Sequence, residues 1–377
     1  MITENILPLE KEEFPLLQHK TMLSSCSQSA LSVKTLDAID AYKNSLIYDG
    51  MDWDLWIQKV EKAKYNFSQL INCDPDEVAI LASVSDSISS VLNSLDLAGK
   101  EICVTELEFP TIGHSALAQQ GKQKFDIKYI PHDDYIIPLE NYKETVSEKT
   151  AITCIAHVCY YSGFKQDLKE ISNIVHQKGS LLLVDAYQSV GAIDIDVKEL
   201  GVDILVTGMQ KFLMGVPGIS FMYINKDVSK NLLPTVTGWF GQENTFDFEL
   251  KQLKYGKYTN RFNTGTPPVI NAYIAEAALS RILEIGTKNI EKYLNELSAF
   301  TIEKANEYGL TIVSPQTLEN KGITTSIYVE NASFIEQEMR KKDIIVSARH
   351  DVIRIAPHIY NTKDDIVHAL DTLKKLI

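Results

Sequence analysis

Short apolar runs alternate with longer amphipathic stretches through the first two thirds of the chain. The clearest run is Leu-Leu-Leu-Val at residues 181–184, which has no polar position and is typical of a parallel strand buried on both faces. We expect further strands at residues 78–81, 101–105, 125–130, 151–157, 204–206 and 219–224. Because helical periodicity lies between these runs, the pattern predicts an α/β fold. Its large domain is expected to have a mostly parallel sheet of the seven-stranded type with helices on both faces.

The last third of the chain has a different pattern. Two long amphipathic stretches, at residues 269–285 and 288–308, predict helices that link the large domain to a smaller α+β domain. The smaller domain is expected to have strands near residues 311–313, 322–329, 344–347 and 352–355 and a helix at 332–342. We therefore divide the chain into an N-terminal segment (1–20), a large domain (21–265) and a small C-terminal domain (266–377), with the linking helices within 269–309.

Composition and charge limit the function classes. The 377 residues are 45% hydrophobic, as in globular proteins, and the formal net charge of −13 argues against binding to nucleic acid or to an anionic membrane surface. No apolar run approaches the length of a membrane span, and the acidic N-terminus does not resemble a signal peptide. The five cysteines match neither a disulfide framework nor a zinc pattern, so we expect reduced thiols, a cytoplasmic location and no metal.

Two polar side chains follow successive apolar runs. Asp185 ends the run at residues 181–184, and Lys211 comes shortly after the run at 204–206. Ligands bind at the carboxyl ends of strands in open α/β sheets. A lysine amine can form a Schiff base with an aldehyde cofactor such as pyridoxal phosphate, and an acid can keep the pyridine nitrogen of that cofactor protonated. Acids that cap loops and lysines in solvent are also common, so these two residues alone favour a structural interpretation.

The flanking sequence favours a cofactor site over this structural interpretation. The segments VDAYQSVGAIDIDV and QKFLMGVPG resemble the fold-type I pyridoxal-phosphate enzymes of aminotransferase class V. That group includes cysteine desulfurases, kynureninases, isopenicillin N epimerase and alanine–glyoxylate aminotransferases. The resemblance covers roughly residues 24–365 and implies that Lys211 holds pyridoxal 5'-phosphate while Asp185 pairs with its ring nitrogen. It also implies that Gln188 hydrogen-bonds the ring oxygen and that Gln210 contacts the phosphate.

The resemblance implies two further cofactor contacts. Ser85 and the amide of Asp86 lie in a hydroxyl-rich turn after the strand at residues 78–81, and the N-terminus of a following helix would favour a phosphate. An ordinary helix cap is the alternative for this turn. Phe109 matches the aromatic ring that the family stacks on the cofactor. The alternative interpretation, a core phenylalanine before a proline turn, also fits the sequence well.

Two C-terminal motifs imply a shared site and a substrate carboxylate. RFNTGTPP at residues 261–268 resembles a motif that reaches across a dimer interface, so Thr266 is expected to contact the partner's cofactor phosphate in a homodimer. Capping of the helix at 269–285 is the alternative. Arg354 in VIRIAPHIYN matches the family's clamp for the substrate α-carboxylate, because a guanidinium binds a carboxylate through two hydrogen bonds. It could instead pair with an acid of the small domain, and Arg349 is a weaker candidate for a second anion contact.

The reaction type is less constrained than the cofactor. Some aminotransferases carry glutamine at the position of Gln210, whereas desulfurases usually carry histidine there. The Arg354 segment instead resembles the kynureninase, epimerase and desulfurase branch. Residues 329–354 contain no cysteine, so we do not expect the persulfide route of cysteine desulfurases. We expect an enzyme that acts on a small-molecule amino acid, with aminotransferase as the first hypothesis. The alternatives are a pyridoxal-phosphate lyase (β-elimination or kynureninase-like cleavage), an epimerase and, from another class, a non-catalytic binding protein of this fold.

Overall fold

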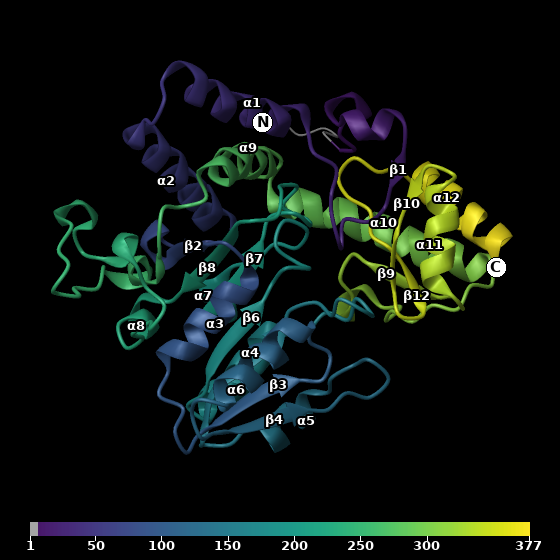
Figure 1. Ribbon diagram of the computed structural model, residues 1–377. Helices are drawn as coiled ribbons and strands as arrows, with labels where there is room; N and C mark the ends of the chain where they lie inside the picture. The colour runs from purple at the N-terminus through teal and green to yellow at the C-terminus, as the bar shows by residue number, and fades with distance from the viewer. Residues whose placement is uncertain (1–6) are drawn as a thin grey trace.

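A seven-stranded sheet forms the centre of the molecule (Figure 1). The computed structural model describes residues 7–377, so the first six residues of the expected N-terminal segment lie outside the described residues. The strands of the sheet are β2 (Val78–Leu81), β3 (Glu101–Thr105), β4 (Asp126–Ile130), β5 (Thr150–Ala156), β6 (Leu181–Asp185), β7 (Ile204–Gly208) and β8 (Ser220–Ile224). Their order is β2-β8-β7-β6-β5-β3-β4, and β8 runs opposite to the other six strands of this sheet. The predicted fold class is confirmed.

Side chains alternate along each strand, so apolar side chains lie on both faces of this sheet, and helices cover both faces. In β3, Ile102 and Val104 pack in one core with Ile88 and Ile112, whereas Cys103 belongs to the core on the opposite face. The helices of the large part of the chain are α1 (Val33–Tyr48), α2 (Trp53–Leu70), α3 (Val84–Ser94), α4 (Pro110–Gln120), α5 (Leu139–Thr145), α6 (Leu168–Gln177), α7 (Val197–Leu200), α8 (Lys226–Ser229) and α9 (Val269–Ile285). Within residues 7–377, no helix has the length and apolar character needed to cross a membrane.

The C-terminal part has a small sheet of its own. Its order is β11 (Ser347–Arg349), β12 (Val352–Ile355) and β9 (Thr325–Tyr328), and the helices beside it are α10 (Thr287–Glu307), α11 (Ala332–Arg340) and α12 (Lys363–Leu376). Strand β1 (Thr21–Met22) pairs in parallel with β10 (Ile344–Ile345), so residues 21–22 lie against the C-terminal part of the chain (Figure 1). The domain limits 21–265 and 266–377 stay a proposal. Residues 21–22, at the start of the proposed large domain, pair with a strand of the C-terminal part.

Three local features of the structure differ from the sequence interpretation. Helix α3 begins at Val84, so Ser85 and Asp86 lie in its first turn and not in a turn before it, because the Ser83 hydroxyl caps the helix. Helix α4 was not predicted, because its sequence PTIGHSALAQQ is rich in small and polar residues and gives a weak helical pattern. The strand expected at residues 311–313 is reduced to a single bridge between Ile312 and Ile327.

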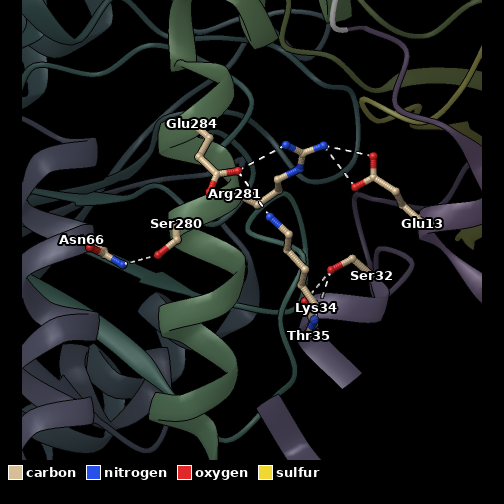
Figure 2. A network of polar contacts seen from close by, with 8 residues as sticks. All are labelled: Glu13, Ser32, Lys34, Thr35, Asn66, Ser280, Arg281 and Glu284. Carbon is tan, nitrogen blue, oxygen red and sulfur yellow. Dashed lines mark hydrogen bonds and ion pairs between the residues drawn. The ribbon is translucent and has the colours of Figure 1, made fainter. Parts of the chain in front are cut away.

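Arg281 of helix α9 contacts Glu13 of the N-terminal segment (Figure 2). Arg281 donates two hydrogen bonds to the carboxylate of Glu13, at 3.0 and 3.1 Å, and one to Glu284 at 3.2 Å. On the same helix, the Ser280 hydroxyl accepts a hydrogen bond from Asn66 of α2 at 2.9 Å. The charged contact between Arg281 and Glu13 joins the segment that leads to β1 to helix α9.

We expect Gly191→Ala to destabilise the fold strongly. Gly191 has φ +91°, and a Cβ there would lie 2.4 Å from the carbonyl oxygen of Phe212, the residue after Lys211. Left-handed backbone alone costs an alanine about 1–2 kcal/mol, and the clash adds to it, so we expect a loss of roughly 3 kcal/mol or more. Gly179→Ala is the matched control, because Gly179 has φ +75° and open space around it. Equal denaturation midpoints for the two variants would contradict the packing described here.

Candidate active site

A cavity of about 380 Å³ opens at the carboxyl ends of β5, β6 and β7. Ligands bind at this edge in open α/β sheets. The predicted site residues that line it are Ser85, Phe109, Asp185, Gln188, Gln210, Lys211 and Arg354. The fold therefore brings together every predicted site residue except Asp86 and Thr266.

Asp185 is held at the last position of β6. Its carboxylate accepts a hydrogen bond from the amide of Tyr187 at 2.9 Å. Burial raises the pKa of Asp185, and the nearby Lys211 ammonium and the Tyr187 amide oppose that rise. Gln188, one turn further on, donates to the carbonyl oxygen of Cys26 at 3.0 Å, and its own Oε1 is buried without a partner among the described residues. The site thus contains a buried carboxylate and an unused acceptor.

Lys211 enters the cavity from the loop after β7. Its Nζ lies 4.1 Å from the centre of the Tyr187 ring and 5.9 Å from that of Phe109. Burial lowers the pKa of Lys211 to about 8, although Asp185 partly counteracts the shift. The loop itself is held in place because the buried His358 contacts the carbonyl oxygen of Phe212 at 3.0 Å through Nε2. With a pKa of about 8, roughly a tenth of the Lys211 amine is neutral, and therefore nucleophilic, at pH 7.

Tyr187 is a site residue that the sequence interpretation missed. Its ring lies directly on Gly208, where an added Cβ would be 2.2 Å from the Tyr187 hydroxyl oxygen. Burial raises the pKa of Tyr187 to about 12, so the phenol stays protonated. Its place two residues after Asp185, at the same strand end, was the available signal.

The N-terminus of α3 faces the cavity. Ser83, Val84 and Ser85 line it, and the Ser85 hydroxyl is 3.2 Å from that of Thr111. The first-turn amides of a helix have no partner within the helix, so this end can hold an anion. The Asp86 amide, however, already donates to the Ser83 hydroxyl oxygen at 3.1 Å. The geometry therefore favours helix capping over a phosphate contact for Asp86.

Phe109 forms one wall of the cavity. The residue is 44% exposed, and its ring packs edge-on against Tyr160 with 5.3 Å between centroids. The neighbouring Glu108 accepts hydrogen bonds from the Thr105 hydroxyl and, at 2.8 Å, from the Ala156 amide. Burial raises the pKa of Glu108 to about 8. Glu108 was not predicted, and it positions Phe109 by bonding β3 to β5.

Arg354 reaches the cavity from β12. It is buried and donates to the carbonyl oxygen of Tyr160 at 2.7 Å and to the hydroxyls of Ser27 and Ser347 at 2.9 and 2.7 Å. Its Nε is buried without a partner, and no carboxylate within residues 7–377 forms an ion pair with it. The pairing with a small-domain acid that the sequence left open is therefore absent from this part of the chain.

Thr266 lies elsewhere. It lines a second cavity of about 170 Å³ together with the rest of residues 263–268 and with Lys64 of α2. Ala82 lines both cavities, but no atom of Thr266 lines the one that contains Lys211.

Comparison with known proteins assigns the class. A family model described as aminotransferase class-V matches residues 53–368. A relative from Bacillus subtilis (strain 168), named uncharacterized aminotransferase YcbU, is 43% identical over 364 residues and covers 96% of each chain. The apo structure of a cysteine desulfurase from Thermococcus onnurineus NA1 superposes with a TM-score of 0.91 at 21% identity, covering 100% of this chain and 99% of that chain. The chain belongs to the aminotransferase class V family.

This membership confirms the predicted family, the predicted enzyme class and its cofactor, pyridoxal phosphate, and leaves transferase and lyase chemistry open. The residues of the cavity fit that cofactor. A buried carboxylate, a lysine with a lowered pKa, an aromatic wall and a helix N-terminus surround one space. The unpartnered Oε1 of Gln188 and Nε of Arg354 are polar atoms that a ligand in this space would satisfy.

We expect cofactor-free protein to capture pyridoxal phosphate faster as the pH rises, with a midpoint near 8. Only the neutral amine of Lys211 is nucleophilic, and burial lowers its pKa to about 8. Asp185→Asn should move the midpoint to lower pH, because the Asp185 charge raises the pKa of Lys211. Stopped-flow absorbance would measure the rate, with Asp126→Asn on the exposed part of β4 as the charge control. A midpoint near 10 would contradict the environment assigned to Lys211.

Proposed function

We propose that this chain is a pyridoxal-phosphate-dependent aminotransferase that holds its cofactor at Lys211 and acts on an amino acid. The observation that carries the proposal is the buried Asp185–Lys211 arrangement, in which an amine with a pKa near 8 shares a cavity with a carboxylate that has a single backbone partner. A lysine in solvent would keep an ordinary pKa and would share no cavity with a buried carboxylate.

Bound pyridoxal phosphate supplies an electron sink for the bonds around the α-carbon of an amino acid. Asp185 holds a proton at the pyridine nitrogen, and Lys211 Nζ moves a proton to and from the substrate. Nε2 of Gln188 bonds the Cys26 carbonyl through one hydrogen, and its second hydrogen would be available to the ring oxygen; Phe109 would lie against the ring and exclude water. Arg354 binds the substrate carboxylate, which orients the bond to be broken.

The phosphate is assigned to the N-terminus of α3. Ser85 supplies a hydroxyl and the first-turn amides supply N–H donors, while Gln210 approaches from the lysine loop. Thr266 is assigned to the phosphate of the partner subunit in a homodimer. Its distance from the Lys211 cavity of its own subunit, in a separate cavity, supports that assignment.

The persulfide route is not proposed. All five cysteines are buried, and burial raises the thiol pKa of Cys73, Cys103, Cys154 and Cys159. A thiolate that attacks sulfur must be exposed and ionised. The buried, unpaired thiols also support our proposal of a cytoplasmic location, where thiols stay reduced. A lyase acting by β-elimination remains the second candidate, because Arg354 would bind its substrate equally well.

A single-turnover experiment separates these reactions. If the protein is an aminotransferase, a reactive amino acid should abolish the visible absorption in one turnover, and a 2-oxo acid should restore it. The loss should match the active sites one to one, since the amino group stays on the enzyme. Stopped-flow spectra with a panel of amino acids would measure it. A visible band that persists while ammonia accumulates over many turnovers would instead identify a lyase.

A shared active site predicts complementation between inactive subunits. We expect Lys211→Ala and Thr266→Ala homodimers to be inactive or strongly impaired. A heterodimer of the two should regain up to half of the wild-type activity, because one of its sites keeps both residues. Differently tagged subunits allow the heterodimer to be purified and assayed. A heterodimer no more active than its parents would contradict the role of Thr266 across the interface.

A further inference from the structure

The β11–β12 hairpin presents two arginines on one face. Ser347 lies directly opposite Arg354 in the antiparallel ladder, and Arg349 follows Ser347 by two residues on the same strand. Residues two apart on a strand point to the same side, so Arg349 and Arg354 are diagonal neighbours, about 7–8 Å apart at their backbones. A two-residue turn, His350 and Asp351, joins the strands and fixes this register.

Both guanidinium groups line the Lys211 cavity. They meet at one hydroxyl, because Ser27 Oγ lies 2.9 Å from an Arg354 nitrogen and 3.5 Å from an Arg349 nitrogen. Among residues 7–377, Arg349 otherwise donates only to the carbonyl oxygen of Ala348, at 2.7 Å. Two positive charges thus converge on a neutral group.

No carboxylate among the described residues pairs with either arginine, and Glu336 acts on Arg354 only from a distance. Among the residues that the structure describes, neither arginine forms an ion pair, and the one acidic side chain that lines the cavity is Asp185, next to Lys211. The chain as a whole carries a net charge of −13, so this local excess of positive charge is specific to the site. Like charges held close together and partly out of water are unfavourable without anions.

The two arginines differ in burial, which indicates that each binds a different anionic group. Arg354 is 1% exposed and has an unpartnered Nε, so a carboxylate that enters the cavity fully would satisfy it. Arg349 is exposed and lies toward solvent. A single carboxylate bound at Arg354 leaves the Arg349 charge without an anion.

We propose that the substrate is an amino acid with a second anionic group, a dicarboxylic amino acid, whose α-carboxylate binds Arg354 and whose side-chain carboxylate binds Arg349. The inference rests on the proposed function and names its substrate class. The cofactor phosphate is not the anion for Arg349, because that phosphate is assigned to α3, and neither arginine contacts Ser83, Val84 or Ser85.

The test compares acidic amino acids with their amides. Aspartate and glutamate differ from asparagine and glutamine in charge while keeping nearly the same size. Wild-type protein loaded with pyridoxal phosphate should show a kcat/KM at least tenfold higher for one of the acids than for its amide. Arg349→Gln should reduce that ratio tenfold or more, because a charged hydrogen-bonded contact is lost, and Arg349→Lys should reduce it less. Arg340→Gln, on the exposed last turn of α11, is the matched control for the loss of one positive charge.

Binding gives a second readout that needs no reaction. Glutarate has two carboxylates and no amino group, and butyrate has one. Calorimetry should show that Arg349→Gln weakens glutarate binding tenfold or more and butyrate binding by much less. The variant should fold, because the Arg349 side chain is exposed and makes few contacts, and its visible cofactor band should remain.

Four outcomes would overturn the inference. A wild-type preference for neutral amino acids would do so and would leave the proposed function standing. An equal loss for acids and amides in Arg349→Gln would show that both arginines clamp one carboxylate. Loss of the cofactor from this variant would assign Arg349 to the phosphate. Wild-type protein that takes up no pyridoxal phosphate would overturn the proposed function, and this inference with it.

Discussion

The active-site cavity depends on the burial of one amine beside one carboxylate. Burial disfavours the charged form of each group, and their mutual attraction favours it. Lys211 has a pKa near 8, and the Asp185 carboxylate accepts a single backbone hydrogen bond, from Tyr187, among the described residues. An amine that is partly neutral can bond to an aldehyde, and an acid with unused acceptor capacity can hold a pyridinium proton. A fully solvated pair would do neither.

The fold provides this arrangement through neighbouring parallel strands. β6 ends at Asp185, and its neighbour β7 leads into the Lys211 loop at the same edge of the sheet. Gly208 leaves room for Tyr187 beside the lysine, and Gly191 lets the chain pass close to Phe212. The C-terminal part completes the site with its arginines, and β1–β10 pairing brings the Ser27 loop to them.

The sequence predicted the parts of the site that lie at ends of strongly apolar strands. Asp185 and Lys211 could be found because continuous hydrophobic runs mark buried parallel strands and the strand ends mark the ligand edge. Glu108 and Tyr187 were missed, because their roles arise from packing between strands that no local pattern records. The phosphate contact of the Asp86 amide stays a prediction, and the bond from this amide to the Ser83 hydroxyl favours the capping alternative. Pairing of β1 with β10 joins residues more than three hundred positions apart, which periodicity cannot predict.

The most direct test of the account is covalent trapping of the cofactor on the lysine. Purified protein would be loaded with pyridoxal phosphate, reduced with borohydride and digested, and the modified peptide would be identified by mass. The account predicts one labelled residue, Lys211, and no label in a Lys211→Ala variant. Labelling of any other lysine, or a wild-type protein that takes up no label, would contradict it.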